Sequence, residues 1–200
     1  MTKNPYQNFT FKFTKTQRDF LTEDEFEKLQ NHSLGDNLSL QKVRDIYMFS
    51  VYTGLRFGDA INLKTENIIN EKDGGKWIQI IQEKTKEPFR VPMLNHAIHI
   101  MRKYESESKI TGYVLARISH QKLNSYLKVI AAMVGISKNL THHTARHTFA
   151  TTIALNNEVP MEIVSRMLGH TNIRTTQIYA KITTQYLKEH TDKLNKKLSK

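Results

Sequence analysis

The 200-residue sequence contains no cysteine. Disulfide bonds are therefore excluded, and no thiolate can serve as a nucleophile or as a metal ligand. Long apolar runs are absent too, because no stretch approaches the roughly 20 consecutive apolar residues that span a bilayer. The first 17 residues are polar and basic, without the apolar segment of a signal peptide. From these absences we expect a chain of the reducing cytoplasm that has no membrane partner.

Acidic residues are few relative to basic ones. The chain has 30 lysines and arginines against 19 aspartates and glutamates, which gives a formal net charge of +11. A surplus of this size favours an anionic partner, and nucleic acid is the commonest one. The alternative is that the surplus lysines serve only to keep the protein in solution.

The spacing of hydrophobic residues predicts a mainly α fold with a small antiparallel three-stranded β-sheet. Thr22 and Glu25 have the spacing of a capping box that opens a helix. The next helix is expected to begin with Ser39 as its N-cap and to end at Gly54. The spacing of hydrophobic residues then changes from that of a helix to that of a strand. Within residues 66–93, two apolar runs flank a Gly-Gly turn, and a third strand follows them. Further helices are expected over 95–108, 119–135, 144–156, 161–169 and 183–200.

Two cations stand at junctions of the predicted elements. Arg56 follows the helix that ends at Gly54, and its planar guanidinium can hold two phosphate oxygens. The alternative for Arg56 is an ion pair with Asp59. Lys84 lies just after a predicted strand, where a hairpin could carry its ammonium to a phosphate or to a leaving oxygen. The alternative for Lys84 is a solvated side chain on an exposed turn. Lys86, two residues later, could substitute for Lys84.

Histidines and an arginine cluster in the segment HHTARH, residues 142–147. His143 and Arg146 are three residues apart and share a helix face. His143 and His147 have a spacing that metal ligands also use, but no glutamate lies between them, cysteine is absent and nearby arginines would repel a dication. We therefore predict no metal site, and His147 is assigned a packing role against the apolar turn that follows.

His170 follows a predicted helix end, and Tyr179 comes nine residues later. A phenol suits phosphodiester exchange, because it can attack phosphorus and leave again while the bond energy is kept. Its ordinary pKa is about 10, so it needs help to lose its proton. Arginines and a histidine would stabilise the charge on the phosphorus oxygens, and a lysine could protonate the leaving oxygen. The sequence shows no clustered carboxylates of the kind that hold Mg²⁺, and no cofactor is predicted. Half-buried packing is the alternative for Tyr179 taken alone.

The set TGLR, KT, HTARHTFAT, MLGH and TTQIYAKI resembles the catalytic domain of the tyrosine recombinase (phage integrase) family. The five elements occur in the family's order and with compatible spacing, over about residues 21–182. The resemblance implies a mostly helical fold whose small sheet bears Lys84. It also implies a site-specific DNA recombinase, an integrase of a mobile element, which cleaves and rejoins strands through a 3′-phosphotyrosyl intermediate without metal.

The resemblance implies a role for each of six residues. Tyr179 would be the nucleophile, Arg56 and Arg146 would clamp the scissile phosphate, His143 would act in proton transfer at the nucleophile, His170 would support the phosphate, and Lys84 would be the general acid for the 5′ oxygen. Because Tyr179 lies in a short, loosely specified segment, we also hypothesise that its phenol swings into the site when partners assemble.

The resemblance divides the chain into three parts. Residues 1–20 resemble an interdomain linker, residues 21–182 form the catalytic domain, and residues 183–200 form a helix that packs either on its own core or on a neighbouring protomer. The implied partner is double-stranded DNA, bound by a homo-oligomer that is a tetramer on DNA, with a monomer as the free form. Family members usually carry an N-terminal core-binding domain, which has no counterpart in residues 1–20. Two alternatives stay open: a DNA-binding fragment inactive without that domain, and a type IB topoisomerase-like activity.

Overall fold

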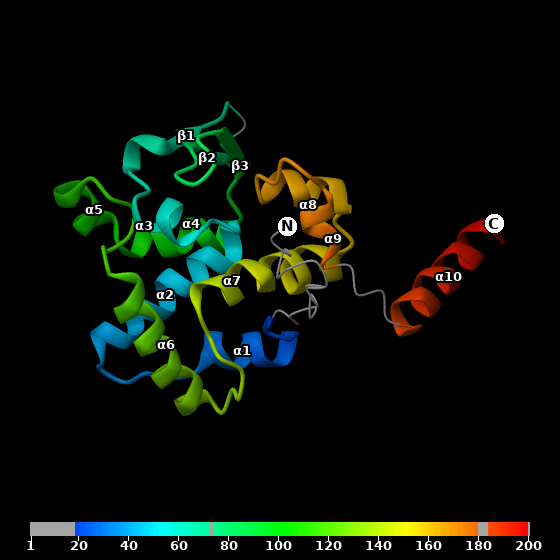
Figure 1. The fold of residues 1–200 in the computed structure, drawn as a ribbon, viewed down its shortest axis with the longest axis horizontal. Helices are drawn as coiled ribbons and strands as arrows, with labels where there is room; N and C mark the ends of the chain where they lie inside the picture. The colour runs from blue at the N-terminus through cyan, green and yellow to red at the C-terminus, as the bar shows by residue number, and fades with distance from the viewer. Residues whose placement is uncertain (1–18, 73, 180–183, 200) are drawn as a thin grey trace, which may run out of the picture.

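The computed structural model describes residues 19–72, 74–179 and 184–199. The described chain is mostly helical, with one three-stranded antiparallel sheet at an end of the helical body, as predicted (Figure 1). The α-helices are α1 (Glu23–Asn31), α2 (Leu38–Thr53), α3 (Phe57–Ile61), α4 (Asn95–Lys103), α5 (Glu105–Thr111), α6 (His120–Val134), α7 (His142–Thr148), α8 (Met161–Met167), α9 (Arg174–Gln177) and α10 (Thr184–Leu198). The other elements are η1 (Thr65–Asn67), η2 (Phe149–Ala154), η3 (Leu155–Asn157), β1 (Ile68–Asn70), β2 (Lys76–Ile81) and β3 (Pro88–Pro92).

Helix α2 forms the centre of the core. It packs against α4, α6 and α7, and it is buried without interruption from Asp45 to Thr53. The helix ends at Gly54 as predicted, but its start differs from the prediction. Asn37 rather than Ser39 is the N-cap, because the Asn37 side chain accepts a hydrogen bond from the Leu40 N–H at 3.1 Å. Asparagine and serine are about equally good caps, so residue preference could not separate them.

The sheet has the order β1-β2-β3, and both neighbouring pairs are antiparallel. Ile78 pairs with Val91 across β2 and β3, and Phe89 is the other buried position of β3. The three side chains belong to the main hydrophobic core, which fixes the sheet on the helical body. The turn between β2 and β3 carries Lys84.

Helix α7 begins at His142, two residues before the predicted start at Thr144, because the Thr144 hydroxyl accepts the Thr141 N–H at 3.2 Å. The predicted helix over 144–156 is present, but it is α-helical only as far as Thr148. After Thr148 the chain continues as the π-helical η2 and the 3₁₀-helical η3. Threonine hydroxyls donate to carbonyls four residues back in this region, for example Thr151 to His147 at 2.7 Å, and such bonds bend helices.

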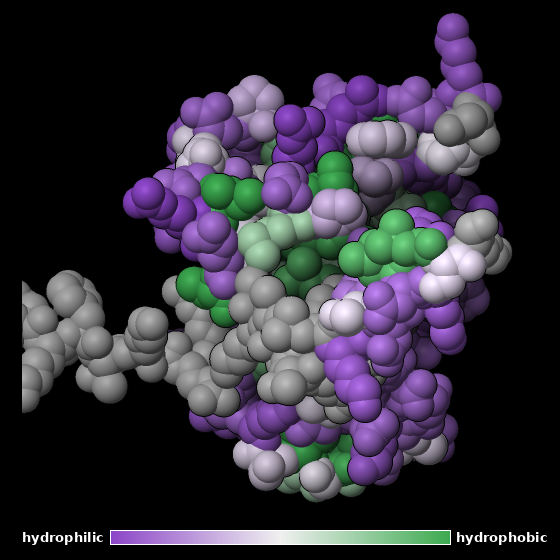
Figure 2. All heavy atoms as spheres, turned by 90° about the vertical axis from the view of Figure 1, so that its right-hand side faces the viewer, coloured by the Kyte–Doolittle hydropathy of each residue, from purple (hydrophilic) through white to green (hydrophobic). Residues whose placement is uncertain are grey.

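Helices α8 and α9 lie beside the sheet end of the body, and α10 extends away from it (Figure 1). The Lys193 side chain of α10 pairs with Glu158 at the end of η3. On this side of the molecule, hydrophilic side chains predominate and hydrophobic ones form separate small patches (Figure 2). No helix in the described ranges is long and apolar enough to cross a membrane. Residues 1–18 of the predicted linker and 180–182 of the predicted catalytic domain lie outside the described residues.

Candidate active site

Arg146 joins three segments that are far apart in the sequence. Its Nη1 donates to the carbonyl oxygen of Gly54 at 2.5 Å, and its Nη2 donates to that of Leu168 at 2.6 Å. The same Nη2 lies 3.0 Å from Nε2 of His170. Because a guanidinium only donates, this ring nitrogen accepts, and His170 Nδ1–H then donates to the Thr176 hydroxyl at 2.9 Å. The end of α2, the end of α8 and the start of α9 thus meet at one buried arginine of α7.

Arg56 lies in the same pocket, directly before α3. Burial lowers the pKa of Arg146 to about 10, and the positive charge of Arg56 is the next cause. Arg56 Nη1 is 3.9 Å from Oδ2 of Asp59, and each of these two atoms is buried with no hydrogen-bond partner in the described part of the chain. The alternative expected for Arg56, an ion pair with Asp59, is thus present, and Arg56 also stands near Arg146, while its binding to phosphate stays a prediction. The guanidinium groups of Arg56 and Arg146 thus lie near the carboxylate of Asp59, and Nη1 of Arg56 is a donor without a hydrogen-bond partner among the described residues.

Two glycines allow the close approaches that build this pocket. Gly54 has φ +67°, and a Cβ there would lie 2.7 Å from Cδ1 of Phe149. Gly169 has φ +62°, and a Cβ there would lie 2.8 Å from Cδ2 of Phe89 in β3. Backbone with positive φ favours glycine. The first glycine lets the α2 end pack on η2, and the second brings the residue before His170 against the sheet.

Lys84 lies in a turn that Asp59 connects to Arg56. Its side chain is exposed in the turn between β2 and β3. The turn is fixed at the preceding residue, because Asp59 Oδ1 accepts the Glu83 N–H at 2.8 Å. Asp59 also faces Arg56, so one carboxylate connects the Lys84 turn to the arginine corner.

Tyr179 is docked inside the protein, with 8% of its surface exposed. Its hydroxyl lies 2.8 Å from Nδ1 of His147, and the two ring centroids are 5.3 Å apart. The negative charge of the phenolate form raises the pKa of Arg146, so the phenol is also in electrostatic reach of the arginines. The hypothesis that the phenol stands outside the site until partners assemble does not describe this structure.

The three histidines of α7 differ in their surroundings. His142 is buried, its Nε2 is 2.7 Å from the Ser50 hydroxyl, and burial lowers its pKa to about 3. His143 is exposed, and its ring stacks near that of His147 with centroids 6.4 Å apart. His147 was expected to pack against the following turn, but it contacts the phenol of Tyr179 instead. The signal that could have indicated this is its position directly after Arg146 and one helical turn after His143.

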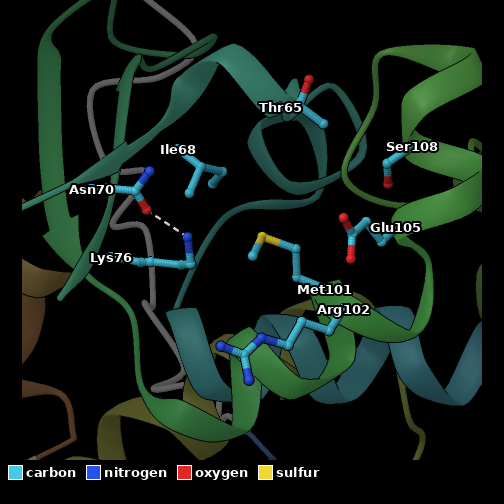
Figure 3. Close-up of a pocket in the computed structure, with 8 residues that line it drawn as sticks. All are labelled: Thr65, Ile68, Asn70, Lys76, Met101, Arg102, Glu105 and Ser108. Carbon is cyan, nitrogen blue, oxygen red and sulfur yellow. Dashed lines mark hydrogen bonds between the residues drawn. The ribbon is translucent and has the colours of Figure 1, made fainter. Parts of the chain in front are cut away.

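In the described part of the chain, neither a metal cluster nor the cavity beside the sheet coincides with this site. Among the described residues, no three histidine, aspartate or glutamate side chains are placed to hold a metal ion. A cavity of about 400 Å³ lies between the sheet and helices α4 and α5 (Figure 3). Its lining is Thr65, Ile68, Asn70, Lys76, Met101, Arg102, Glu105 and Ser108, which includes none of the six candidate residues.

The fold is that of tyrosine recombinase catalytic domains. The chain is similar to the crystal structure of a XerA recombinase, with TM-score 0.70 and 23% identity, over 90% of this chain and 66% of that one. It is also similar to a XerH site-specific recombinase, with TM-score 0.69 and 21% identity, over 88% of this chain and 53% of that one. The sequence matches the Phage integrase family over residues 19–186, and the chain belongs to this family, as the motifs predicted.

Curated relatives agree with the family. The chain is 29% identical over 184 residues to the tyrosine recombinase XerD of Oceanobacillus iheyensis, covering 86% of this chain and 60% of the relative. It is 31% identical over 199 residues to the tyrosine recombinase XerA of Pyrococcus furiosus, covering 92% of this chain and 64% of the relative. The chain thus spans about three fifths of the length of these relatives.

Proposed function

We propose that this chain is the catalytic domain of a site-specific DNA recombinase, an integrase that cuts and rejoins DNA strands through a 3′-phosphotyrosyl intermediate without metal. One observation carries the proposal: the buried phenol of Tyr179 lies in electrostatic reach of Arg146, which stands near Arg56. Paired guanidinium groups attract a phosphate, and the phenol is the nucleophile near them.

The arginines and His170 bind the phosphate in this proposal. Arg146 uses Nη1 and Nη2 to hold the backbone of Gly54 and Leu168, which leaves its other N–H groups for phosphate oxygens. Arg56 contributes the buried Nη1 that lacks a hydrogen-bond partner among the described residues. Charge that develops on the oxygens in the transition state is stabilised by donors already in place. Asp59 keeps Arg56 and the Lys84 turn together.

Lys84, His143 and Tyr179 carry out the proton and bond changes. The Tyr179 oxygen attacks phosphorus, and the bond from phosphorus to the 5′ oxygen breaks. Lys84 protonates that oxygen, for which its position on a hairpin turn suits it. His143 takes part in proton transfer on the nucleophile side, one helical turn from His147.

The partner in this proposal is double-stranded DNA, which the net charge of +11 favours. Two of the similar solved structures are a XerH recombinase bound to a palindromic difH substrate and a lambda integrase dimer bound to a COC′ core site. We further propose a tetramer on DNA, a monomer when free, and the cytoplasm as the location. Helix α10 is the segment that would pack on a neighbouring protomer, or on its own core.

Covalent capture on DNA tests the proposal. The chain is incubated with a pool of nicked duplexes of randomised sequence, in which a cut strand diffuses away and traps the enzyme. We expect a complex that survives denaturation with wild type and disappears with Tyr179→Phe. The proposal fails if the chain binds duplexes from the pool but forms no such complex.

The same positive charge also fits a second function, a DNA-binding module that is inactive in catalysis by itself. Retention on DNA without covalent capture supports this second function. Relaxation of supercoiled plasmid by the monomer would instead support a type IB topoisomerase-like activity.

A further inference from the structure

The contact between Tyr179 and His147 has no role in the set of six residues. His147 Nδ1 is 2.8 Å from the phenol oxygen, the rings are tilted by 51°, and both side chains are buried. Nδ1 of a neutral imidazole can accept from the phenol or, as the other tautomer, donate to the phenol oxygen. Two arrangements differ by the phenol proton alone: the phenol donating to an unprotonated Nδ1, and a protonated Nδ1 donating to the phenolate. These two arrangements are the states before and after a proton transfer.

Resting on the proposed function, we propose that His147 takes the proton of the Tyr179 phenol during cleavage and returns it during rejoining. In cleavage, the O–H bond of Tyr179 breaks as Nδ1 of His147 takes the proton. The phenol oxygen forms the bond to phosphorus, the bond to the 5′ oxygen breaks, and that oxygen takes a proton from Lys84. In rejoining, the 5′ hydroxyl gives its proton to Lys84 and attacks phosphorus, while the departing phenolate takes its proton back from His147.

The structure around His147 suits this role. Helix α7 carries Arg146 and His147 at adjacent positions, about 100° apart around the helix axis. One side chain therefore faces the phosphate pocket while the next faces the phenol. Both rings are shielded from solvent, because only 8% of the surface of each residue is exposed. The backbone at His147 is held by the Thr151 hydroxyl, which donates to its carbonyl at 2.7 Å.

The same hydrogen bond could instead inhibit cleavage, by holding the phenol away from the phosphate. The two roles predict opposite effects of removing the base. If His147 accepts the proton, its loss slows cleavage, and if it restrains the phenol, its loss speeds cleavage. A substitution that keeps the hydrogen bond but not the basicity separates them best.

The substitution His147→Asn has this property, because the amide oxygen comes near the position of Nδ1 and accepts a hydrogen bond without taking up a proton. The control His99→Asn changes an exposed histidine of α4. Single-turnover capture is measured on a nicked duplex selected with wild type, with oxygen or sulfur as the 5′ leaving atom. A thiolate leaves without a proton, so sulfur removes the need for the general acid but not for the base.

We expect His147→Asn to slow capture about 100-fold or more with both substrates, as loss of a general base does. Lys84→Ala should be slow with oxygen and recover with sulfur, and His99→Asn should match wild type. The melting temperature of each variant is measured first, and His147→Gln replaces the asparagine variant if that one melts early.

Three results would overturn the inference. They are a wild-type rate for His147→Asn, a faster rate, or a rate that sulfur restores. In each of these results wild type still captures DNA, so the proposed function stands. If wild type binds duplexes from the pool but captures none, the proposed function is overturned and this inference with it.

Discussion

Acidification is expected to destabilise the protein through His142, the residue that fixes the start of α7 to α2. The Ser50 hydroxyl donates to the Ile46 carbonyl at 3.0 Å, so it accepts the Nε2–H of His142 at 2.7 Å. Burial, and after it the charges of His143, His120 and Arg146, lower the pKa of His142 to about 3. His142 is therefore neutral in the folded protein at any pH above about 3.

The size of the stability loss follows from the difference in the pKa of His142 between the folded and the unfolded protein. In the unfolded chain His142 has a pKa near its ordinary value of about 6.5. Between about pH 3 and 6.5 the unfolded state thus binds one proton more than the folded state, and stability falls as the pH falls. The slope is about 1.4 kcal/mol per pH unit for one proton, so going from pH 6 to 4.5 costs about 2 kcal/mol.

The assay is urea unfolding at several pH values, with wild type compared to His142→Gln. The variant lacks the titrating ring, so its free energy of unfolding should fall less steeply with acid by about 1.4 kcal/mol per pH unit. Carboxylates contribute equally to both proteins and cancel in the difference. His99→Gln, which changes an exposed histidine, should keep the wild-type slope. Equal slopes for wild type and His142→Gln would refute the assignment of His142 as a buried neutral histidine.

Three further predictions concern the pocket and its partner. Gly54→Ala should lower the free energy of unfolding by more than Gly112→Ala: both positions have positive φ, which costs about 1–2 kcal/mol, but only at Gly54 would the new Cβ meet Phe149. Urea unfolding checks this, and equal losses would contradict the packing described. Arg56→Met should abolish covalent capture. It should change the free energy of unfolding by less than about 1 kcal/mol, because the positive charge that it removes repels Arg146 and its Nη1 has no hydrogen-bond partner among the described residues. Capture at the wild-type rate would exclude Arg56 from the site. DNA affinity should fall with salt, with a log–log slope of about −0.9 per phosphate contacted; titration in rising salt measures it, and a flat response would argue against binding to the backbone.

Local signals predicted much of the fold. The capping box is present: Thr22 N–H donates to Glu25 at 2.8 Å, and the Thr22 hydroxyl accepts from Glu25 N–H. Gly54 ends α2 with positive φ, and the three strands lie within the predicted range. These features depend on the conformational preferences of residues that are close in sequence, so the sequence alone indicates them. The change to π-helix after Thr148 depends on tertiary packing, and the sequence pattern did not show it.

The motif order predicted a set of site residues, and the structure places Arg146 in contact with His170 and near Arg56 and Tyr179, while their catalytic roles stay predictions. The motifs could not show that His147 meets Tyr179, because that contact joins residues 32 positions apart and depends on where the chain after α9 lies relative to α7.

The structure of the covalent complex with DNA tests the central claim most directly. The account predicts one phosphorus atom bonded to the Tyr179 oxygen, with Arg56, Arg146 and His170 in hydrogen-bond contact with its free oxygens. A phosphate linked to another residue, or a phosphate on Tyr179 that neither arginine touches, would contradict the account.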